Sequence, residues 1–395
     1  MGLKKFELIE LEESLKEAKI PNQIEDLKQK YIKWTKEAKE LKEKFESEFS
    51  KEKTELIIEK MKIIKILNCD DSFFKNGALL VGFDESQQSK IGTYARISCF
   101  KFGESQVWFE DGKYKFRDYM YKPMMGYLED SYQKVRAYKK AINNFVNNLE
   151  HEFQGTPLLS SVIKIKDWYE KIFPYDINDE WDRNMPTVGH VADRIRTADE
   201  LICTILRMKK IKSDFPNREI IFLGDGIAAF RAHIFPPSIF IKFFLKFLKY
   251  YDLNYYAFSK TCRLREKTTR ALILPIISAI SFEPPLDGGP FIVEMSQAHS
   301  ESNSHLVRLI KRKMPALRFD VPKDINLNGA ISIIKKLIPF SPLGYPLCLE
   351  HAHNASSLTR LEWRILDVKY LGAQEDPSTK NLVSNLRKYV LPSTK

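Results

Sequence analysis

Apolar residues recur at alternating steps of three and four through the first part of the chain, where Lys and Glu fill most other positions. The members of this repeat are Ile24, Leu27, Tyr31, Trp34, Ala38, Leu41 and Phe45. They form three heptads of an a/d seam, which predicts a helix that either packs on its own domain or pairs with another chain. We therefore predict a helical arm over residues 1–66 that contacts a partner or a second copy of the protein.

The pattern changes beyond residue 66 to short apolar runs that are typical of strands. Residues 77–88 contain such a run, which closes on Asp84. Residues 95–116 alternate between apolar and polar positions, and Asp111-Gly112 marks a hairpin turn within them. A strand with an acidic end followed by antiparallel strands predicts a meander at the start of the domain.

Helical and extended patterns then follow one another to the end of the chain. The predicted helices cover 127–175 with a break at FQGTP (153–157), 193–212, 236–252, 327–338 and 348–370. The predicted strands are one that ends at Asp225, residues 253–260, and a pair formed by PFIVEMSQ (290–297) and ALRFDVP (316–322). Strands that begin as a meander and then alternate with helices indicate an α/β domain with a mixed sheet over residues 67–395.

Charge and cysteine content narrow the classes of function. The 395 residues carry a formal net charge of +11, which favours a polyanionic partner, nucleic acid before an anionic membrane. Five scattered cysteines without a CxxC pair argue against a disulfide framework and a zinc site. The sequence has no run of 18 apolar residues and no signal-peptide pattern at its start, so we expect a cytoplasmic protein without membrane association.

Two predicted strands end in a carboxylate where the apolar run stops, at Asp84 and at Asp225. Strand ends on neighbouring strands bring such groups close together, where they repel unless a divalent cation lies between them. Oxygen ligands suit Mg²⁺ or Mn²⁺ better than zinc, and a basic protein with such a site is typical of a phosphodiesterase. The alternative is that both are ordinary turn aspartates, because Asp-Gly is common turn chemistry.

A further pattern lies near the C-terminus, in GYPLCLEHAHNA (344–355). Tyr345 and His353 are eight residues apart, a little over two helical turns, so they lie near one face of a helix that Pro346 begins. His351 points elsewhere. A helical histidine of this kind is either a functional group or a packed or solvated side chain.

The order of these segments resembles the NurA nuclease family, RNase H-like nucleases that work with the hexameric HerA translocase. Five places carry the resemblance: LLVGFDES (79–86), IIFLGDGIAAF (220–230), YYAFSKTCRL (255–264), ALRFDVP (316–322) and YPLCLEHAH (345–353). They are similar to the family's two Asp-Gly-Ser strand motifs, its Ser-Lys strand motif, its late strand with Arg and an acidic residue, and its Tyr-to-His helix. The set spans residues 77–370 and leaves the arm and residues 100–190 uncovered.

The resemblance implies a role for each matching residue. It implies an RNase H-like sheet flanked by helices, with Mn²⁺ or Mg²⁺, one or two ions, held by Asp84, Asp225, His353 and a glutamate on the helix before Asp225. Glu200 is the best match, as the only glutamate between Trp181 and Arg218, with Asp199 as the fallback. Tyr345 would support the metal or the phosphate. Lys260 would neutralise phosphate charge, although a strand-end lysine in solvent is an equal alternative.

The resemblance also implies an activity and partners. These are 5′-to-3′ exonuclease and single-strand endonuclease activity on DNA, in DNA end processing or phage defence, by a homodimer docked on a HerA-type ATPase. The chain departs from the family at Glu85, which stands where the first motif has Gly, and at Ile227, which stands where the second has Ser. Residues 100–190 are longer than expected and are interpreted as an inserted subdomain, with Lys and aromatic residues suited either to a nucleic acid strand or to a packed hairpin.

Three other functions compete with this interpretation. A non-catalytic RNase H-like subunit that grips DNA or a partner fits the altered Gly and Ser positions. A Piwi-like nuclease would need a guide-end pocket, for which the sequence offers no residues. A purely structural coiled-coil adaptor is disfavoured because the predicted arm is only about a sixth of the chain.

Overall fold

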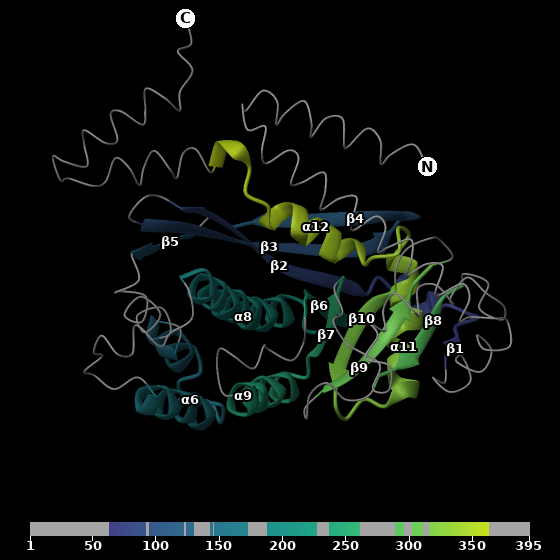
Figure 1. Ribbon diagram of the computed structural model, residues 1–395. Helices are drawn as coiled ribbons and strands as arrows, with labels where there is room; N and C mark the ends of the chain where they lie inside the picture. The colour runs from purple at the N-terminus through teal and green to yellow at the C-terminus, as the bar shows by residue number, and fades with distance from the viewer. Residues whose placement is uncertain are drawn as a thin grey trace, which may run out of the picture. The chain divides into compact units, whose positions relative to one another are not determined.

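The computed structural model (Figure 1) describes residues 63–91, 95–121, 124–129, 143–144, 146–172, 188–226, 237–260, 289–295, 302–310 and 316–362. The arm predicted over residues 1–66 therefore lies outside the described residues except at its end, where Ile64–Lys65 form the strand β1. The hydrophobic segment 269–280 also lies outside them. None of the helices in the described part of the chain combines the length and apolar composition that crossing a membrane requires.

The described strands form one mixed sheet of ten strands, ordered β1-β8-β9-β10-β7-β6-β2-β3-β4, with β5 also paired to β3. The first five strands are β1 (Ile64–Lys65), β2 (Leu79–Ile91), β3 (Ala95–Glu110), β4 (Lys113–Met120) and β5 (Met124–Glu129). The other five are β6 (Ile220–Asp225), β7 (Asn254–Ser259), β8 (Phe291–Glu294), β9 (Ser302–Arg308) and β10 (Leu317–Pro322).

The strand directions bring distant parts of the chain to one edge of the sheet. β2, β3 and β4 are an antiparallel meander, turned between β3 and β4 at Asp111 and Gly112, which both have positive φ. β6 pairs parallel with β2, and β7 pairs parallel with β6. Because parallel strands point the same way, their carboxyl ends meet at one edge. The predicted meander and hairpin turn are confirmed.

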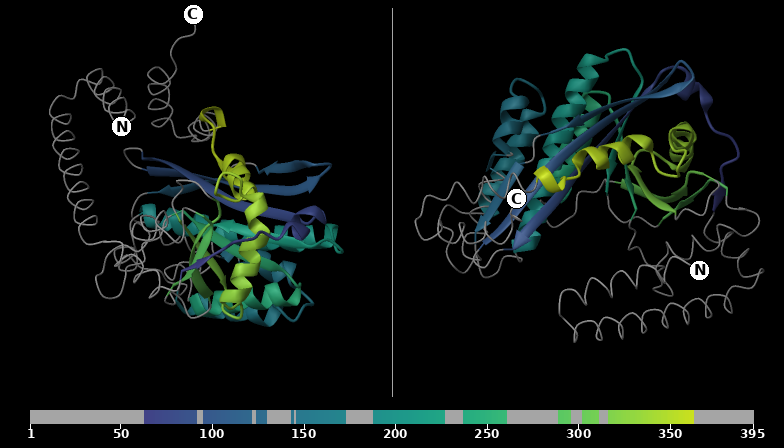
Figure 2. Two further views of the ribbon diagram at one scale, coloured as in Figure 1. Left: turned by 90° about the vertical axis from the view of Figure 1, so that its right-hand side faces the viewer. Right: turned by 90° about the horizontal axis from the view of Figure 1, so that it is seen from above.

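Helices cover both faces of the sheet (Figures 1 and 2). The described helices are α4 (Asp71–Lys75), α6 (Leu159–Ile172), α8 (Val188–Asp214), α9 (Pro237–Tyr250), α11 (Leu327–Leu337), the 3₁₀ turn η1 (Ile338–Phe340) and α12 (Leu347–Ser356). α6, α8 and α9 pack on one face, and α11 and α12 pack on the other.

Alternation along the central strands builds the two cores. In β2, Val81 and Phe83 face α8 and α9, whereas Leu80 faces α11 and α12. A strand covered on both faces reads as a continuous apolar run, which is why the sequence around residues 79–83 shows no polar positions. Asp84, the first polar residue after this run, therefore departs from the pattern of a strand that is buried on both faces.

The structure corrects several expectations about the elements. β9 was not predicted, and it separates β8 from β10, so the expected pair PFIVEMSQ and ALRFDVP do not contact each other as strands. The helix predicted over 348–370 ends at Ser356, since Ser357 is extended. Residues 127–129 belong to strand β5 rather than to a helix.

The described residues within the predicted insertion over 100–190 contribute to the sheet and to its core. Among these residues, β3 and β4 belong to the main sheet, with β4 as its last strand, and α6 packs in the same core as α8 and α9. Phe102 packs in the core on the α8 face and Val107 in the core on the α12 face, so both faces of this hairpin are buried.

Candidate metal centre

The edge of the sheet where β2 and β6 stop pairing carries the acidic residues. The parallel register pairs Phe83 with Gly224, so Asp84 and Asp225 lie at the next level of the two strands. β2 continues past this point to Ile91, paired to β3. Asp225 ends β6, and Gly226 turns the chain away with a φ of 132°, which favours glycine. Asp225-Gly226 is thus a turn, and the carboxylate before it points into the site.

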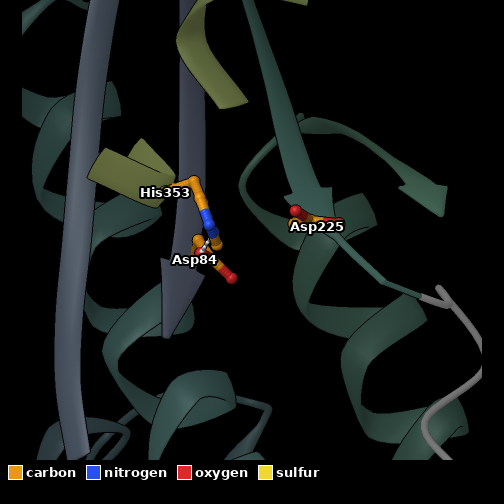
Figure 3. A group of neighbouring side chains, drawn as sticks. All are labelled: Asp84, Asp225 and His353. Carbon is orange, nitrogen blue, oxygen red and sulfur yellow. Dashed lines mark hydrogen bonds and ion pairs between the residues drawn. The ribbon is translucent and has the colours of Figure 1, made fainter. Parts of the chain in front are cut away.

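Helix α12 brings the third polar group to this edge. The helix lies against β2, β3 and β4 (Figures 1 and 2) because Gly82 and Gly103 leave room for its backbone. A Cβ at either glycine would lie 2.4 Å from a backbone atom of the helix. His353, in the last turn of α12, points to Asp84, and its Nδ1 lies 2.8 Å from Asp84 Oδ2 (Figure 3).

Asp84 is held by two donors on α12. The hydroxyl of Ser356 donates to Asp84 Oδ2 at 2.9 Å, and His353 Nδ1 lies beside the same oxygen. An ionised carboxylate only accepts hydrogen bonds, so the proton in the contact lies on Nδ1 of His353. This arrangement leaves Asp84 Oδ1 and His353 Nε2 for another ligand.

Asp84, Asp225 and His353 form the group in the described residues that fits a metal ion (Figure 3). One ligand atom from each lies within 4.8 Å of those from the other two. Opposite ligands of an octahedral Mg²⁺ are about 4.2 Å apart and adjacent ligands about 3 Å, so the three side chains would close in around a bound ion. Two carboxylates and one imidazole suit Mn²⁺ or Mg²⁺.

Tyr345 and Lys260 lie on the β6 side of the same site. Lys260 Nζ is 3.6 Å from Asp225 Oδ2 and 4.3 Å from the centroid of the Tyr345 ring. The Tyr345 hydroxyl approaches Asp225 without reaching good hydrogen-bond geometry. Half of the Lys260 side chain is exposed, so its ammonium group is accessible to an incoming anion.

Glu200 reaches the site from α8, on the other face of the sheet. Its carboxylate accepts from Arg196 Nη1 at 2.9 Å, and the same nitrogen donates to the main-chain oxygen of Glu85 at 3.1 Å. Burial and the charges of Asp84 and Asp225 raise the pKa of Glu200 to about 8, and Arg196 opposes the rise. Glu200 is thus in the electrostatic field of both aspartates.

Asp225 is partly buried beside another carboxylate. Burial and the charge of Asp84 raise its pKa above the ordinary value, while Lys260, Tyr345 and His353 oppose the shift. Burial first, and neighbouring carboxylates second, thus disfavour the ionised forms of Asp225 and Glu200, and a divalent cation would offset both effects.

All six residues predicted for the site therefore gather at one edge of the sheet: Asp84, Glu200, Asp225, Lys260, Tyr345 and His353. Asp199, the fallback for Glu200, contacts Glu85 instead. Glu85 follows Asp84 in β2, so its side chain lies on the α8 face, opposite the face of Asp84. Its presence in place of the family's glycine leaves the Asp84 side unobstructed.

Sequence reasoning missed three residues that shape the site. Ser356 and Arg196 each had a signal, because they lie one helical turn from His353 and Glu200, respectively. Tyr255 had no such signal in the sequence. Its hydroxyl lies over Gly224, and a Cβ at Gly224 would be 2.1 Å from the hydroxyl oxygen. Only the pairing of β6 with β7 places these two residues side by side.

No protein-family model and no curated protein match the chain. Among solved structures, the NurA nuclease from Sulfolobus solfataricus is similar at 11% identity and a TM-score of 0.48, over 94% of this chain and 99% of that chain. NurA bound to dAMP and manganese is similar at 11% identity and a TM-score of 0.40, over 88% and 98%. NurA with manganese is similar at 10% identity and a TM-score of 0.37, over 87% and 98%. Because these TM-scores lie below 0.5, the chemistry of the site rests on its own residues.

Proposed function

We propose that the protein is a metal-dependent deoxyribonuclease that hydrolyses phosphodiester bonds at the edge of the sheet formed by β2 and β6. The observation that carries this proposal is the convergence of Asp84, Asp225 and His353 within 4.8 Å. The strand order β4-β3-β2-β6-β7, a meander followed by two parallel strands, supports an RNase H-like core. The formal net charge of +11 supports a polyanionic substrate.

In this mechanism Asp84, Asp225, Glu200 and His353 would hold Mn²⁺ or Mg²⁺, one or two ions. When bound there, the metal would supply Lewis-acid chemistry for phosphodiester hydrolysis. Ser356 orients Asp84 by its hydrogen bond, as outer partners of metal ligands do. Lys260 places a positive charge beside Asp225, where it offsets the charge of the scissile phosphate. Tyr345 supports Lys260 through the face of its ring.

The test is a cleavage assay on labelled linear and single-stranded DNA with Mn²⁺, Mg²⁺ or EDTA. We expect cleavage with either metal and none with EDTA. Asp225→Ala should lower it at least about 100-fold because it removes a metal ligand. Asp214→Ala, at the exposed end of α8, is the matched control and should cleave at the wild-type rate. Equal cleavage by wild type and Asp225→Ala would contradict the proposal.

One observation favours a second function, a non-catalytic subunit that binds DNA or a partner. Lys260 pairs with Asp225 and Arg196 pairs with Glu200, so side-chain cations already neutralise part of the acidic group. This alternative predicts no Mn²⁺ binding that depends on Asp225 and no cleavage when the partner ATPase is added.

We further propose that the chain works as a homodimer with a HerA-type hexameric ATPase, in DNA end processing or phage defence. The heptad seam of the predicted arm supports this proposal. Replacing Leu27 and Leu41 of the seam by Lys should yield monomers in sedimentation velocity while leaving cleavage intact. A dimer that persists would place the interface elsewhere.

A further inference from the structure

Glu85 is a buried carboxylate on the α8 face of β2. Its side chain is 4% exposed, and neither of its carboxylate oxygens has a hydrogen-bond donor among the described residues. An ionised carboxylate buried without a donor costs several kcal/mol, so such a group usually takes up a proton or contacts a cation.

The nearest partner of Glu85 is another carboxylate. Asp199 of α8 lies within hydrogen-bonding distance of it, and Glu200 adds a further negative charge. The neighbouring cation is Arg196. Its Nη1 donates to the carboxylate of Glu200 and to the main-chain oxygen of Glu85, and not to the carboxylate of Glu85. Cys203 also faces this cluster, and burial raises the pKa of its thiol, so it adds no charge.

The charges at this end of the sheet do not balance. Among the described residues, Arg196 and Lys260 are the cationic side chains whose charges act on this acidic group, which contains five carboxylates. The carboxylates are Asp84, Glu85, Asp199, Glu200 and Asp225. When all are ionised and His353 is neutral, three negative charges remain in excess, and one divalent ion at Asp84 and Asp225 would still leave one. A phosphodiester approaching the site would add another.

We propose that Glu85 and Asp199 bind a second divalent cation, Mn²⁺ or Mg²⁺, on the α8 face of β2, separate from the ion held by Asp84, Asp225 and His353. Mg²⁺ commonly takes one or two carboxylates and keeps several waters, which fits a site with two protein ligands. Asp199 is only partly buried, so it offers a route for the ion to the buried Glu85.

The second ion neutralises Glu85 and Asp199 on the α8 face of the sheet. Consecutive residues of a strand point to opposite faces, so this ion lies across the sheet from the ion at Asp84. Its effect on the reaction is therefore electrostatic: it leaves Glu200 free to serve the ion at Asp84. This assignment rests on the proposed function for the identity of the metal, but the number of bound ions is measured independently of cleavage.

The experiment counts bound ions in the full chain. Mn²⁺ is titrated into metal-free protein, and the free ion is measured by electron paramagnetic resonance. We expect Glu85→Gln, which keeps the shape of the side chain and removes its charge, to bind one ion fewer per chain than wild type. Asp199→Asn should also bind one ion fewer, and it serves as the test if Glu85→Gln does not fold. The control Asp214→Asn should bind as many ions as wild type.

Two results would overturn the proposal. An equal number of ions in wild type and Glu85→Gln would show that Glu85 and Asp199 share a proton instead. Loss of all ions in Glu85→Gln, at an unchanged unfolding temperature, would show that Glu85 acts on the Asp84 centre. Failure of the proposed function is seen separately, as an Asp225→Ala variant that binds as many ions as wild type.

Discussion

Single atoms of Asp84 determine what the site can bind. Oδ2 accepts from Ser356 and lies beside His353 Nδ1, so both donors fix the rotation of the carboxylate. Ser356 is fully buried, which shields its hydrogen bond from competition with water. Ser86 adds a further link through its hydroxyl, which donates to the main-chain oxygen of Ser356. A serine outside the sequence motifs thus positions a metal ligand.

Removing this hydroxyl should weaken metal binding without removing a ligand. We expect Ser356→Ala to lower the affinity for Mn²⁺ about tenfold, because Asp84 loses the donor that orients it. Titration calorimetry measures the affinity. Ser357→Ala is the control, since Ser357 is exposed and its hydroxyl donates to the main-chain oxygen of His353. An unchanged affinity in Ser356→Ala would show that His353 alone orients Asp84.

At the scale of elements, α12 is the part of the site that depends most on close packing. Its backbone rests on two glycines, Gly82 of β2 and Gly103 of β3, which the register places on the same face of the sheet as Asp84. Close approach lets a helical side chain as short as His353 reach a residue in the sheet beneath it. The glycines therefore contribute to the site although neither carries a functional group.

Filling this contact should move the helix. In Gly103→Ala the new Cβ would lie 2.4 Å from Ala352 O and 2.5 Å from Ser356 N. We expect a loss of about 1–3 kcal/mol in the free energy of unfolding, together with weaker Mn²⁺ binding, because His353 moves with α12. Urea denaturation and Mn²⁺ titration measure the two effects.

The control for this change is Gly112→Ala in the β3–β4 turn. Gly112 has a φ of 74° and open space around it, so the substitution costs only backbone strain of about 1 kcal/mol. Its Mn²⁺ affinity should match wild type. A Gly103→Ala variant that is destabilised but binds Mn²⁺ normally would show that the position of α12 is not critical for the site.

At the scale of the whole molecule, the carboxylates at the acidic end of the sheet lower the free energy of unfolding of the metal-free protein when they are ionised. Burial is the main cause that raises the pKa of Glu85, Asp199, Glu200 and Asp225 above their ordinary values. Each of these groups binds its proton more tightly in the folded chain than in the unfolded chain. The metal-free fold is therefore less stable when they are ionised, as expected for a site that is completed by cations.

This charge predicts an unusual dependence on pH. The folded chain holds more protons than the unfolded chain between the ordinary carboxyl pKa near 4.5 and the Glu200 pKa of about 8. The free energy of unfolding in EDTA should therefore fall as the pH rises through this window. Glu200→Gln should show a smaller fall, which urea denaturation at pH 5.5, 7 and 8.5 would measure. Equal falls in the two proteins would mean that Glu200 titrates normally.

The sequence alone predicted those features that depend on local pattern. Alternation and turn residues predicted the β3–β4 hairpin, and apolar runs predicted β2, β6 and β7. It missed β9, because SNSHLVR begins with four polar residues and lacks the apolar run of the other strands. It also extended the last helix past Ser356, where a local stop signal was weak.

Asp84 and Asp225 could be chosen from the sequence because each follows directly on an apolar run, whereas the roles of the other four site residues came from the family resemblance. Their distances could not be predicted, because Asp84, Asp225 and His353 are more than 100 residues apart and meet only through strand pairing. The face to which Glu85 points depends on the register of β2, and a shift of one residue would reverse it. The sequence therefore determines which groups are available, whereas long-range pairing and close backbone contact at glycine determine which of them share a metal ion.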